Sequence, residues 1–244
     1  MNILVTICAR GGSKGIPHKN IKKIANKPLI AYSINTAYNF AKYINQQGFH
    51  LDVALSTDDI EIKKTADHFG LKTEYLRPEY LATDSASKIE TIEHLLEYHE
   101  NVNNKKYDYT LDLDVSSPLR TLEDLKEAFG LILNDDKAVN IFSVSNAHKS
   151  PYFNMVEKKE NGYYHLVSVP SQNIYTRQSS PIVYEMNASF YFYKQDFFIN
   201  KYKSAITDKS LIYLMKHQCF DLDTIEDFEY MSFLIENNKL NFAI

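Results

Sequence analysis

Short apolar runs alternate with longer amphipathic stretches along most of the chain. Residues 3–9 form an apolar run in which apolar and polar positions do not alternate, which is typical of a central strand covered on both faces. After Pro28, apolar residues recur at helical spacing and predict a first crossover helix. This order of strands and helices is typical of an α/β protein with a doubly wound, mostly parallel sheet.

The same periodicities predict the remaining elements. Strands are expected at residues 51–56, 72–76, 107–115 and 139–144, and helices at residues 60–69, 88–100, 121–134 and 225–237. Residues 145–185 depart from the alternation, since they are richer in Tyr, Asn and Ser, and NGYYH at 161–165 predicts a hairpin turn. We therefore interpret residues 1–244 as a single domain with an inserted arm at about 145–185.

A glycine-rich, basic loop follows the first apolar run. Gly11, Gly12 and Gly15 allow positive φ angles and a close approach of the backbone, so that amide groups can converge on an anion. The loop also carries the cations Arg10, Lys14, His18 and Lys19. Its spacing fits neither the P-loop nor the dinucleotide fingerprint. An ordinary glycine-rich turn is the alternative, but a phosphate-binding loop also explains the cations.

Composition narrows the partners that this loop can have. The net charge is −4 and no block of like charges stands out, which argues against binding to nucleic acid. No apolar run approaches the roughly 18 residues that cross a bilayer, and no signal-peptide pattern stands at the start. Cys8 and Cys219 provide neither a disulfide framework nor a zinc-ligand spacing. We expect a cytoplasmic protein without a membrane partner whose basic loop binds a small anion.

Two pairs of aspartates follow apolar segments. Asp112 and Asp114 end the strand predicted at 107–115, and residues two apart in a strand point to the same face. Asp221 and Asp223 repeat this spacing. Mg²⁺ takes oxygen ligands and binds nucleotide phosphates together with one or two carboxylates. The pairs therefore predict Mg²⁺ as a cofactor, although Asp112 or Asp114 could instead cap the turn that follows.

Five motifs resemble the CMP-sialic acid synthetase (acylneuraminate cytidylyltransferase) family. They are ICARGGSKGIPHKN, LRPEYLATDSAS, LDLDVSSPLR, TRQSSPIVYEMNASFYFY and FDLDTIEDF, in the order of the family. LDLDVSSPLR, PYFN, TRQ and MNAS are most similar to the branch that activates legionaminic acid, a bacterial relative of sialic acid. The resemblance implies a fold of the nucleotide-diphospho-sugar transferase type, and a homodimer in which the arm reaches the second subunit.

The resemblance also implies an activity. CTP and a nine-carbon 2-keto sugar acid, expected to be N,N'-diacetyllegionaminic acid, would give a CMP-sugar and pyrophosphate without a covalent enzyme intermediate. A CMP-N-acetylneuraminic acid synthetase and a CMP-KDO synthetase are the nearest alternatives. A nucleotide-binding regulator without activity is an alternative of a different class, against which the intact aspartate pairs argue.

Individual residues receive roles from the loop and from the resemblance. Nucleotide binding is assigned to Ala9, Arg10, Gly11, Gly12, Ser13, Lys14, Lys19, Asn20, Arg77 and Ser87. Sugar binding is assigned to Asp114, Ser116, Ser117, Arg120, Arg177, Gln178 and Asn187. The expected catalytic residues are Arg10, Lys19 and Asp223, and the expected metal ligands are Asp221, Asp223 and Asp114.

The sequence departs from the family at three of these motifs. Many relatives have Ser at the position of Lys88, Gln at that of Asp114, and Arg at that of Glu185. Asp114 therefore has two open roles, as a metal ligand or as a residue that selects the sugar. Because Glu185 stands where relatives have an arginine, recognition of the sugar carboxylate is expected to depend more on Arg177 here than in those relatives. The planar guanidinium of Arg177 suits a carboxylate.

Overall fold

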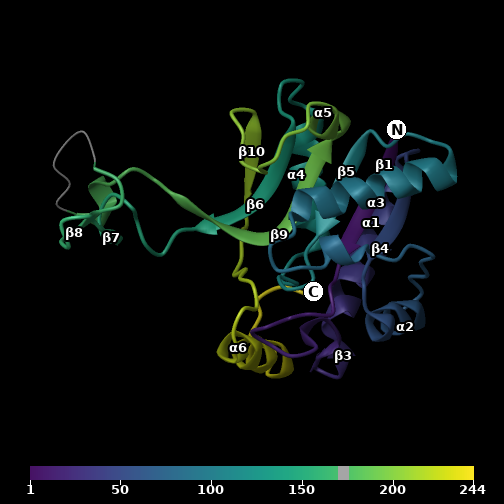
Figure 1. The fold of residues 1–244 in the computed structure, drawn as a ribbon, viewed down its shortest axis with the longest axis horizontal. Coiled ribbons are helices and arrows are strands. Elements are labelled where there is room, and N and C mark those ends of the chain that lie inside the picture. The colour runs from purple at the N-terminus through teal and green to yellow at the C-terminus, as the bar shows by residue number, and fades with distance from the viewer. Residues whose placement is uncertain (170–175) are drawn as a thin grey trace.

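The computed structural model of the protein describes residues 1–169 and 176–244, without the side chain of Arg177. Its main feature is a six-stranded sheet with the order β10-β6-β9-β5-β1-β4 (Figure 1). The strands are β1 (Asn2–Cys8), β4 (His50–Ser56), β5 (Tyr109–Leu113), β6 (Asn140–Asn146), β9 (Tyr184–Lys194) and β10 (Ser210–Leu214). Neighbouring strands are parallel except where β9 pairs with β5 and β6. The predicted α/β fold with a mostly parallel sheet is confirmed.

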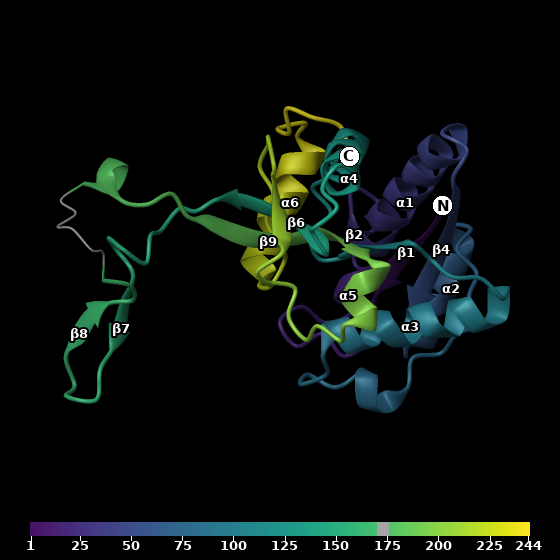
Figure 2. The same cartoon turned by 90° about the horizontal axis from the view of Figure 1, so that it is seen from above.

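Helices cover both faces of this sheet (Figure 2). They are α1 (Leu29–Gln46), α2 (Ile60–His68), α3 (Lys88–Asn103), α4 (Leu122–Leu133), α5 (Gln195–Ile199) and α6 (Ile225–Glu236). Side chains of α1 and α4 join one core, and those of α3 and α5 join the other. In β1, Ile3 and Val5 face the first core and Leu4 faces the second, so that this strand is apolar on both sides. In the described ranges, no helix combines the length and the apolar character that crossing a membrane requires.

The helix starts follow local sequence signals. The Asp59 side chain caps α2 by accepting hydrogen bonds from two backbone N–H groups. Thr121 and Asp124 form a capping box at α4, and Thr224 and Asp227 form another at α6. These caps fix where the loops after β4, β5 and β10 end.

The strand assignments at residues 72–76, β9 and β10 differ from the sequence-based prediction. No strand was predicted at residues 184–194, where β9 lies in the middle of the sheet. Residues 72–76 were expected to be a strand, but they belong to none. The contacts of this segment with residues 55–57 come from the Thr73 hydroxyl and from the backbone N–H and guanidinium of Arg77, and not from a backbone ladder. The strand β10 was not predicted. It lies at an edge of the sheet and leaves Ile212 and Leu214 partly exposed, so its short sequence has no clear buried face.

The chain between β6 and β9 extends away from the sheet (Figure 1). This segment, residues 147–183, is called the arm below. It carries the hairpin of β7 (Val156–Lys158) and β8 (Tyr164–Leu166), with Gly162 at a φ of 84° near its turn. The hairpin that NGYYH predicted is therefore present. The arm also exposes large apolar side chains, namely Met155, Val156, Tyr163, Tyr164, Val167, Val169 and Ile182.

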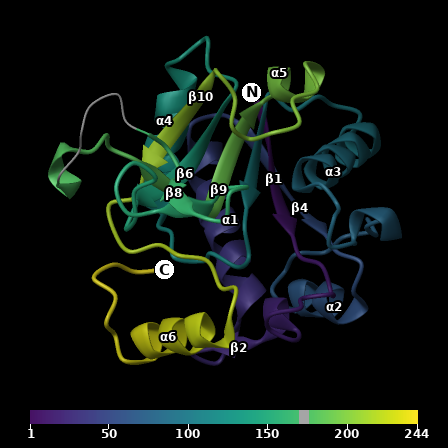
Figure 3. The ribbon, with the colours of Figure 1, turned by 60° about the vertical axis from the view of Figure 1, so that its left-hand side comes forward.

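The last helix, α6, lies beside the short strand β2 (Lys23–Ile24), at the bottom of Figure 3. The Lys22 ammonium lies 4.5 Å from the centroid of the Phe228 ring, and the Ala25 N–H donates to Glu236 Oε1 at 3.3 Å. The segment after β1 and the C-terminal segment are therefore held together beside the sheet.

Candidate active site

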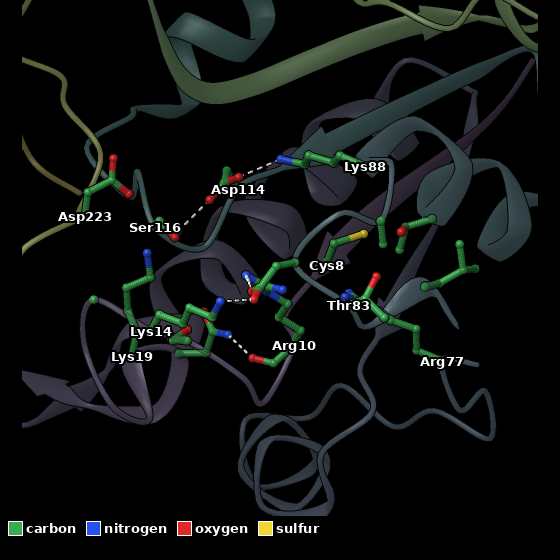
Figure 4. Close-up of a pocket in the computed structure, with 17 residues that line it drawn as sticks. Cys8, Arg10, Lys14, Lys19, Arg77, Thr83, Lys88, Asp114, Ser116 and Asp223 are labelled. Carbon is green, nitrogen blue, oxygen red and sulfur yellow. Dashed lines mark hydrogen bonds and ion pairs between the residues drawn. The ribbon is translucent and has the colours of Figure 1, made fainter. Parts of the chain in front are cut away.

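A cavity of about 400 Å³ lies at the carboxyl ends of β1 and β5 (Figure 4). Loops that follow strands line it, as expected for a parallel sheet. Its walls are formed by Cys8, Arg10, Ser13, Lys14, Gly15, Lys19, Asn20, Arg77, Leu81, Thr83, Asp84, Ala86, Lys88, Thr91, Asp114, Ser116 and Asp223. Four segments that are far apart in sequence therefore meet at one polar cavity.

The cations of the first loop lie on one side of this cavity. Arg10 Nη2 is 2.8 Å from Asp84 Oδ1, and the Lys14 ammonium pairs with the other oxygen of the same carboxylate. These contacts lower the pKa of Asp84, the hydrogen bond from Lys14 having the largest effect. Lys19 Nζ donates to the carbonyl oxygen of Leu222 at 2.6 Å. Two cations thus already converge on an anionic group, which is the arrangement that phosphate oxygens require.

The backbone angles of the glycines in the first loop differ from the expectation. None of Gly11, Gly12 and Gly15 has a positive φ, and the left-handed residue of this loop is His18, with a φ of 53°. The expectation of positive φ angles at these glycines is therefore wrong. Gly15 is required for another reason, because a Cβ atom there would overlap the carbonyl oxygen of Asp223. The glycine lets the first loop pack directly against the segment that carries Asp223.

Asn20 and Arg77 are fixed by hydrogen bonds at the cavity wall. Asn20 Nδ2 donates to the carbonyl oxygen of Arg10 at 2.9 Å. Arg77 donates from Nε to Ser56 Oγ at 2.9 Å and from Nη2 to the carbonyl oxygen of Ser56 at 2.8 Å. Both side chains are largely buried. Their orientation is set before any ligand binds.

Four predicted nucleotide-binding residues do not line the cavity: Ala9, Gly11, Gly12 and Ser87. Ala9 is buried, and its N–H donates to the carbonyl oxygen of Ser56. Ser87 caps α3 by accepting a hydrogen bond from the N–H of Glu90 at 3.3 Å. Ser87 is therefore explained by its role as the N-cap of α3.

Asp112 and Asp114 lie on one side of β5, as strand geometry predicts, but a lysine lies between them. Lys88 Nζ is 2.8 Å from Asp112 Oδ2 and 2.6 Å from Asp114 Oδ2. Burial would lower the pKa of Lys88, but the two carboxylates raise it well above its ordinary value. Burial would raise the pKa of Asp114, but Lys88 lowers it. Lys88 and Asp114 are therefore both charged at neutral pH.

Ser117, Arg120 and Asn187 were expected to bind the sugar, but the structure places them behind the cavity wall. All three are at most 3% exposed. Arg120 donates to the carbonyl oxygens of Asp114 and Ser117, and Ser117 Oγ donates to the carbonyl oxygen of Asn187. Burial lowers the pKa of Arg120 to about 10, which leaves it charged at neutral pH. These residues hold the loop that presents Asp114 and Ser116.

Asp221 and Asp223 lie in the loop after β10, and not at a strand end as expected. Asp223 is exposed at the cavity, whereas Asp221 is half-buried and does not line it. Burial, and then the charges of Asp223 and Asp114, raise the pKa of Asp221. The Leu222 N–H donates to the carbonyl oxygen of Ser116 at 2.9 Å, so this loop is fixed against the loop after β5.

The carboxylates of Asp114, Asp221 and Asp223, which were the expected metal ligands, fit a metal ion only in part. Within residues 1–169 and 176–244, no group of three His, Cys, Asp or Glu side chains is close enough to enclose an ion. Mg²⁺ commonly uses one or two carboxylates and completes its shell with phosphates and water, so a full protein cage is not needed. The mutual repulsion that raises the pKa of Asp221 is what a divalent cation would relieve. Asp221 and Asp223 therefore fit such an ion better than Asp114, which Lys88 already neutralises.

The arm residues lie away from the cavity of their own chain. Gln178 is exposed in the short helix Arg177–Ser179 on the arm (Figure 1). The side chain of Arg177, which was expected to bind the sugar carboxylate, lies outside the described part of the structure.

Sequence reasoning missed several cavity residues. Asp84 was not among the predicted site residues, and Lys88 had been noted only as a departure from the family. Cys8 also lines the cavity, but burial raises the pKa of its thiol to about 12, so it is not a nucleophile at neutral pH. The density of charged residues before α3 was the one available signal for Asp84 and Lys88.

Comparison with known proteins extends along the whole chain. The sequence profile of a family described as cytidylyltransferase matches residues 4–240. Post-translational flagellin modification protein B of Campylobacter coli is 36% identical over 98% of this chain and 97% of its own. CMP-N,N'-diacetyllegionaminic acid synthase of Campylobacter jejuni is 35% identical over 98% of this chain and 97% of its own.

A solved structure shares the fold. It is a CMP:2-keto-3-deoxy-manno-octonic acid synthetase complexed with CTP, which matches 98% of this chain and 100% of its own, with a TM-score of 0.67 and 16% sequence identity. At this identity, the likeness concerns the arrangement of the sheet and helices alone.

Proposed function

Because this chain belongs to the cytidylyltransferase family of the sialic acid type and is therefore a CTP-using nucleotidyltransferase for nonulosonic acids, we propose that its sugar is N,N'-diacetyllegionaminic acid. The relative named for this sugar is 35% identical over nearly the full length of both chains. Asp114 supports the proposal, because it presents a carboxylate at the cavity and belongs to the motif LDLDVSSPLR, which resembles the legionaminic acid branch. A carboxylate accepts hydrogen bonds only, and so changes which sugar groups can be bound there.

The observation that carries the proposed binding of CTP is the convergence of charged groups at the cavity. Arg10 and Lys14 meet at one point of the wall, and Lys19 lies beside the segment of Asp223. We assign these cations to the β- and γ-phosphates of CTP. Asn20 and Arg77, whose side chains are already fixed by hydrogen bonds, are assigned to the cytidine end.

The reaction proposed for this site is a direct displacement. The hydroxyl on C2 of the sugar acid attacks the α-phosphorus of CTP, the bond to the β-phosphate breaks, and pyrophosphate leaves. Such transfers depend mainly on alignment and on neutralisation of charge, so no enzyme nucleophile is needed. Arg10, Lys14 and Lys19 stabilise the charge that develops on the pyrophosphate. The proton of the attacking hydroxyl is released to solvent as the new bond to phosphorus forms.

Mg²⁺ is part of the proposal, with Asp223 and Asp221 as the residues that would hold it. When bound, this ion supplies positive charge at the α-phosphate. Asp223 is the better placed of the two, since it is exposed at the cavity.

We also propose a homodimer in which the arm reaches the partner subunit. The arm exposes many apolar side chains that nothing in its own chain covers within the described residues. Gln178 and the backbone of Arg177 lie on this arm, so a partner would bring them to its neighbour's cavity. A cytoplasmic location is proposed because Cys8 and Cys219 are both free thiols.

Pyrophosphate release tests the proposed function. The protein is assayed with CTP and Mg²⁺, and with N,N'-diacetyllegionaminic acid, N-acetylneuraminic acid or KDO as the acceptor. We expect the highest kcat/KM with the legionaminic acid. A higher value with another acid would reassign the substrate, and no release with any of them would favour the nucleotide-binding regulator.

A further inference from the structure

Lys88 is the first residue of α3, and its ammonium group lies between the carboxylates of Asp112 and Asp114 at the end of β5. Figure 4 shows its contact with Asp114. It donates a hydrogen bond to Asp114 Oδ2 at 2.6 Å. Its distance to Asp112 Oδ2 is 2.8 Å. The Tyr191 ring adds a cation–π contact, with its centroid 5.3 Å from Nζ. One cation is thus held by three groups from two neighbouring strands.

Asp112 needs a positive charge beside it. Its side chain is fully buried, and Oδ1 accepts a hydrogen bond from Thr6 Oγ1 at 2.9 Å. Oδ2 is buried as well and receives no hydrogen bond of good geometry, so the ammonium of Lys88 meets it as a charge contact. A buried carboxylate without a counter-charge is strongly unfavourable. The structure therefore requires a cation at this position, and Lys88 provides it.

The same position has the ligands of a divalent metal site. Two strand-end carboxylates that share a face are oxygen donors of the kind that Mg²⁺ and Mn²⁺ prefer. A metal ion between Asp112 and Asp114 would lie where the ammonium lies now. Two positive charges at that distance repel strongly in a partly buried site, so the lysine and the ion exclude each other.

We infer that Lys88 is a positioning residue that acts as a tethered cation for Asp112 and Asp114 and prevents this pair from binding a divalent metal ion. The inference deepens the proposed function and rests on it, since it leaves the catalytic metal to Asp221 and Asp223. It also removes one of the two roles open to Asp114. The carboxylate of Asp114, held by Lys88 and by the Ser116 N–H at 2.7 Å, then faces the sugar as a fixed acceptor.

Counting bound Mn²⁺ by electron paramagnetic resonance tests the inference, with and without CTP. Lys88→Met removes the ammonium and keeps the length of the side chain, and should bind one Mn²⁺ per chain more than the unaltered protein. Asp114→Asn added to Lys88→Met should abolish the extra site. Lys88→Arg keeps the positive charge and should keep the original count.

A matched control uses another lysine that contacts the same helix, from the segment after α5. Lys201 Nζ lies 2.6 Å from Glu93 Oε1 on α3, outside the cavity, so Lys201→Met removes a comparable ion pair and should leave the Mn²⁺ count unchanged. A Lys88→Met protein that binds no additional Mn²⁺ would overturn the inference.

One further variant keeps the inference testable if Lys88→Met does not fold. Asp114→Asn alone, with Lys88 intact, should bind as many Mn²⁺ ions as the unaltered protein, and loss of an ion would make Asp114 a metal ligand and overturn the inference. These counts need no turnover. A failure of the proposed function would instead appear as absent pyrophosphate release with normal Mn²⁺ counts.

Discussion

The cavity and the arm differ in how completely one chain satisfies their side chains. At the cavity, charged groups have partners within the chain: Arg10 pairs with Asp84, and Lys88 pairs with Asp112 and Asp114. On the arm, Val169 is 84% exposed and Ile182 is 80% exposed. The difference supports the two proposals that the sheet and its loops bind the nucleotide within one chain and that the arm contacts a surface outside its own chain.

The two regions should therefore respond to substitution in different ways. Changes at the cavity should alter catalysis and leave assembly intact. Changes to the exposed apolar side chains of the arm should alter assembly first, and catalysis through assembly.

The largest effect is expected at Asp223. Asp223→Asn removes half of the negative charge of the proposed metal pair, and should lower kcat by a factor on the order of 100 or more. The thermal unfolding midpoint should barely move, because this side chain is exposed and has no core packing to lose. Glu226→Gln, at an exposed neighbouring acid in α6, serves as the control and should keep kcat. Equal activities of the two variants would remove Asp223 from the site.

Arg10 and Lys19 should show the next largest effect. Each Ala substitution removes charge-assisted hydrogen bonds worth roughly 1.5–3 kcal/mol, which corresponds to a loss of about 10- to 100-fold in kcat/KM for CTP. Lys23→Ala, at an exposed lysine beyond the loop, is the matched control. Steady-state kinetics with CTP as the varied substrate measures the effect, and unchanged values in both variants would contradict the assignment of the loop to the triphosphate.

On the arm, Val169→Asp and Ile182→Asp should weaken the proposed dimer. Burial of a large aliphatic side chain contributes about 1.5–3 kcal/mol, so each substitution should raise the dissociation constant roughly 10-fold or more. Sedimentation over a range of protein concentrations measures this constant. Leu76→Asp, at a side chain 64% exposed on the body, is the control and should leave assembly unchanged. A protein that is monomeric and fully active before any substitution would contradict the role of the arm.

The smallest effect is expected for the pH dependence of stability, through the contact between His217 and Asp124 of α4. Burial would lower the pKa of His217, but its hydrogen bond to Asp124 at 2.8 Å raises it above 6.5. Because the folded-state pKa is raised, the contact stabilises the protein fully below pH 6.5, and this contribution is lost as the pH rises through the folded-state pKa. Urea unfolding at pH 6 and pH 8 should therefore show a smaller difference for His217→Gln than for the unaltered protein. An unchanged difference would contradict the charged pair.

Local sequence signals predicted the parts of the fold that depend on local structure. The apolar run at residues 3–9 and the shared face of Asp112 and Asp114 were predicted from periodicity. The starts of the predicted helices at 60–69, 121–134 and 225–237 are fixed by short-range caps at Asp59, Thr121 and Thr224. Each needs only neighbours in sequence to form.

Long-range contacts could not be predicted in this way. Arg120 has the appearance of an anion-binding residue in its motif, but its partners are carbonyl oxygens of its own loop and Ser189 from β9. Lys88 meets Asp114 only because α3 packs across the end of β5. The meeting of such residues depends on tertiary packing, which periodicity does not describe.

Mixing two strongly impaired variants tests the central claim, that the cavity of one chain and the arm of its partner form one site. Lys19→Ala damages the cavity and keeps the arm, whereas Arg177→Ala damages the arm and keeps the cavity. Exchange of subunits at equal amounts should give mixed dimers with one intact site each, and restore about a quarter of the activity of the unaltered protein. A mixture no more active than its separate components would show that each chain works without its partner's arm.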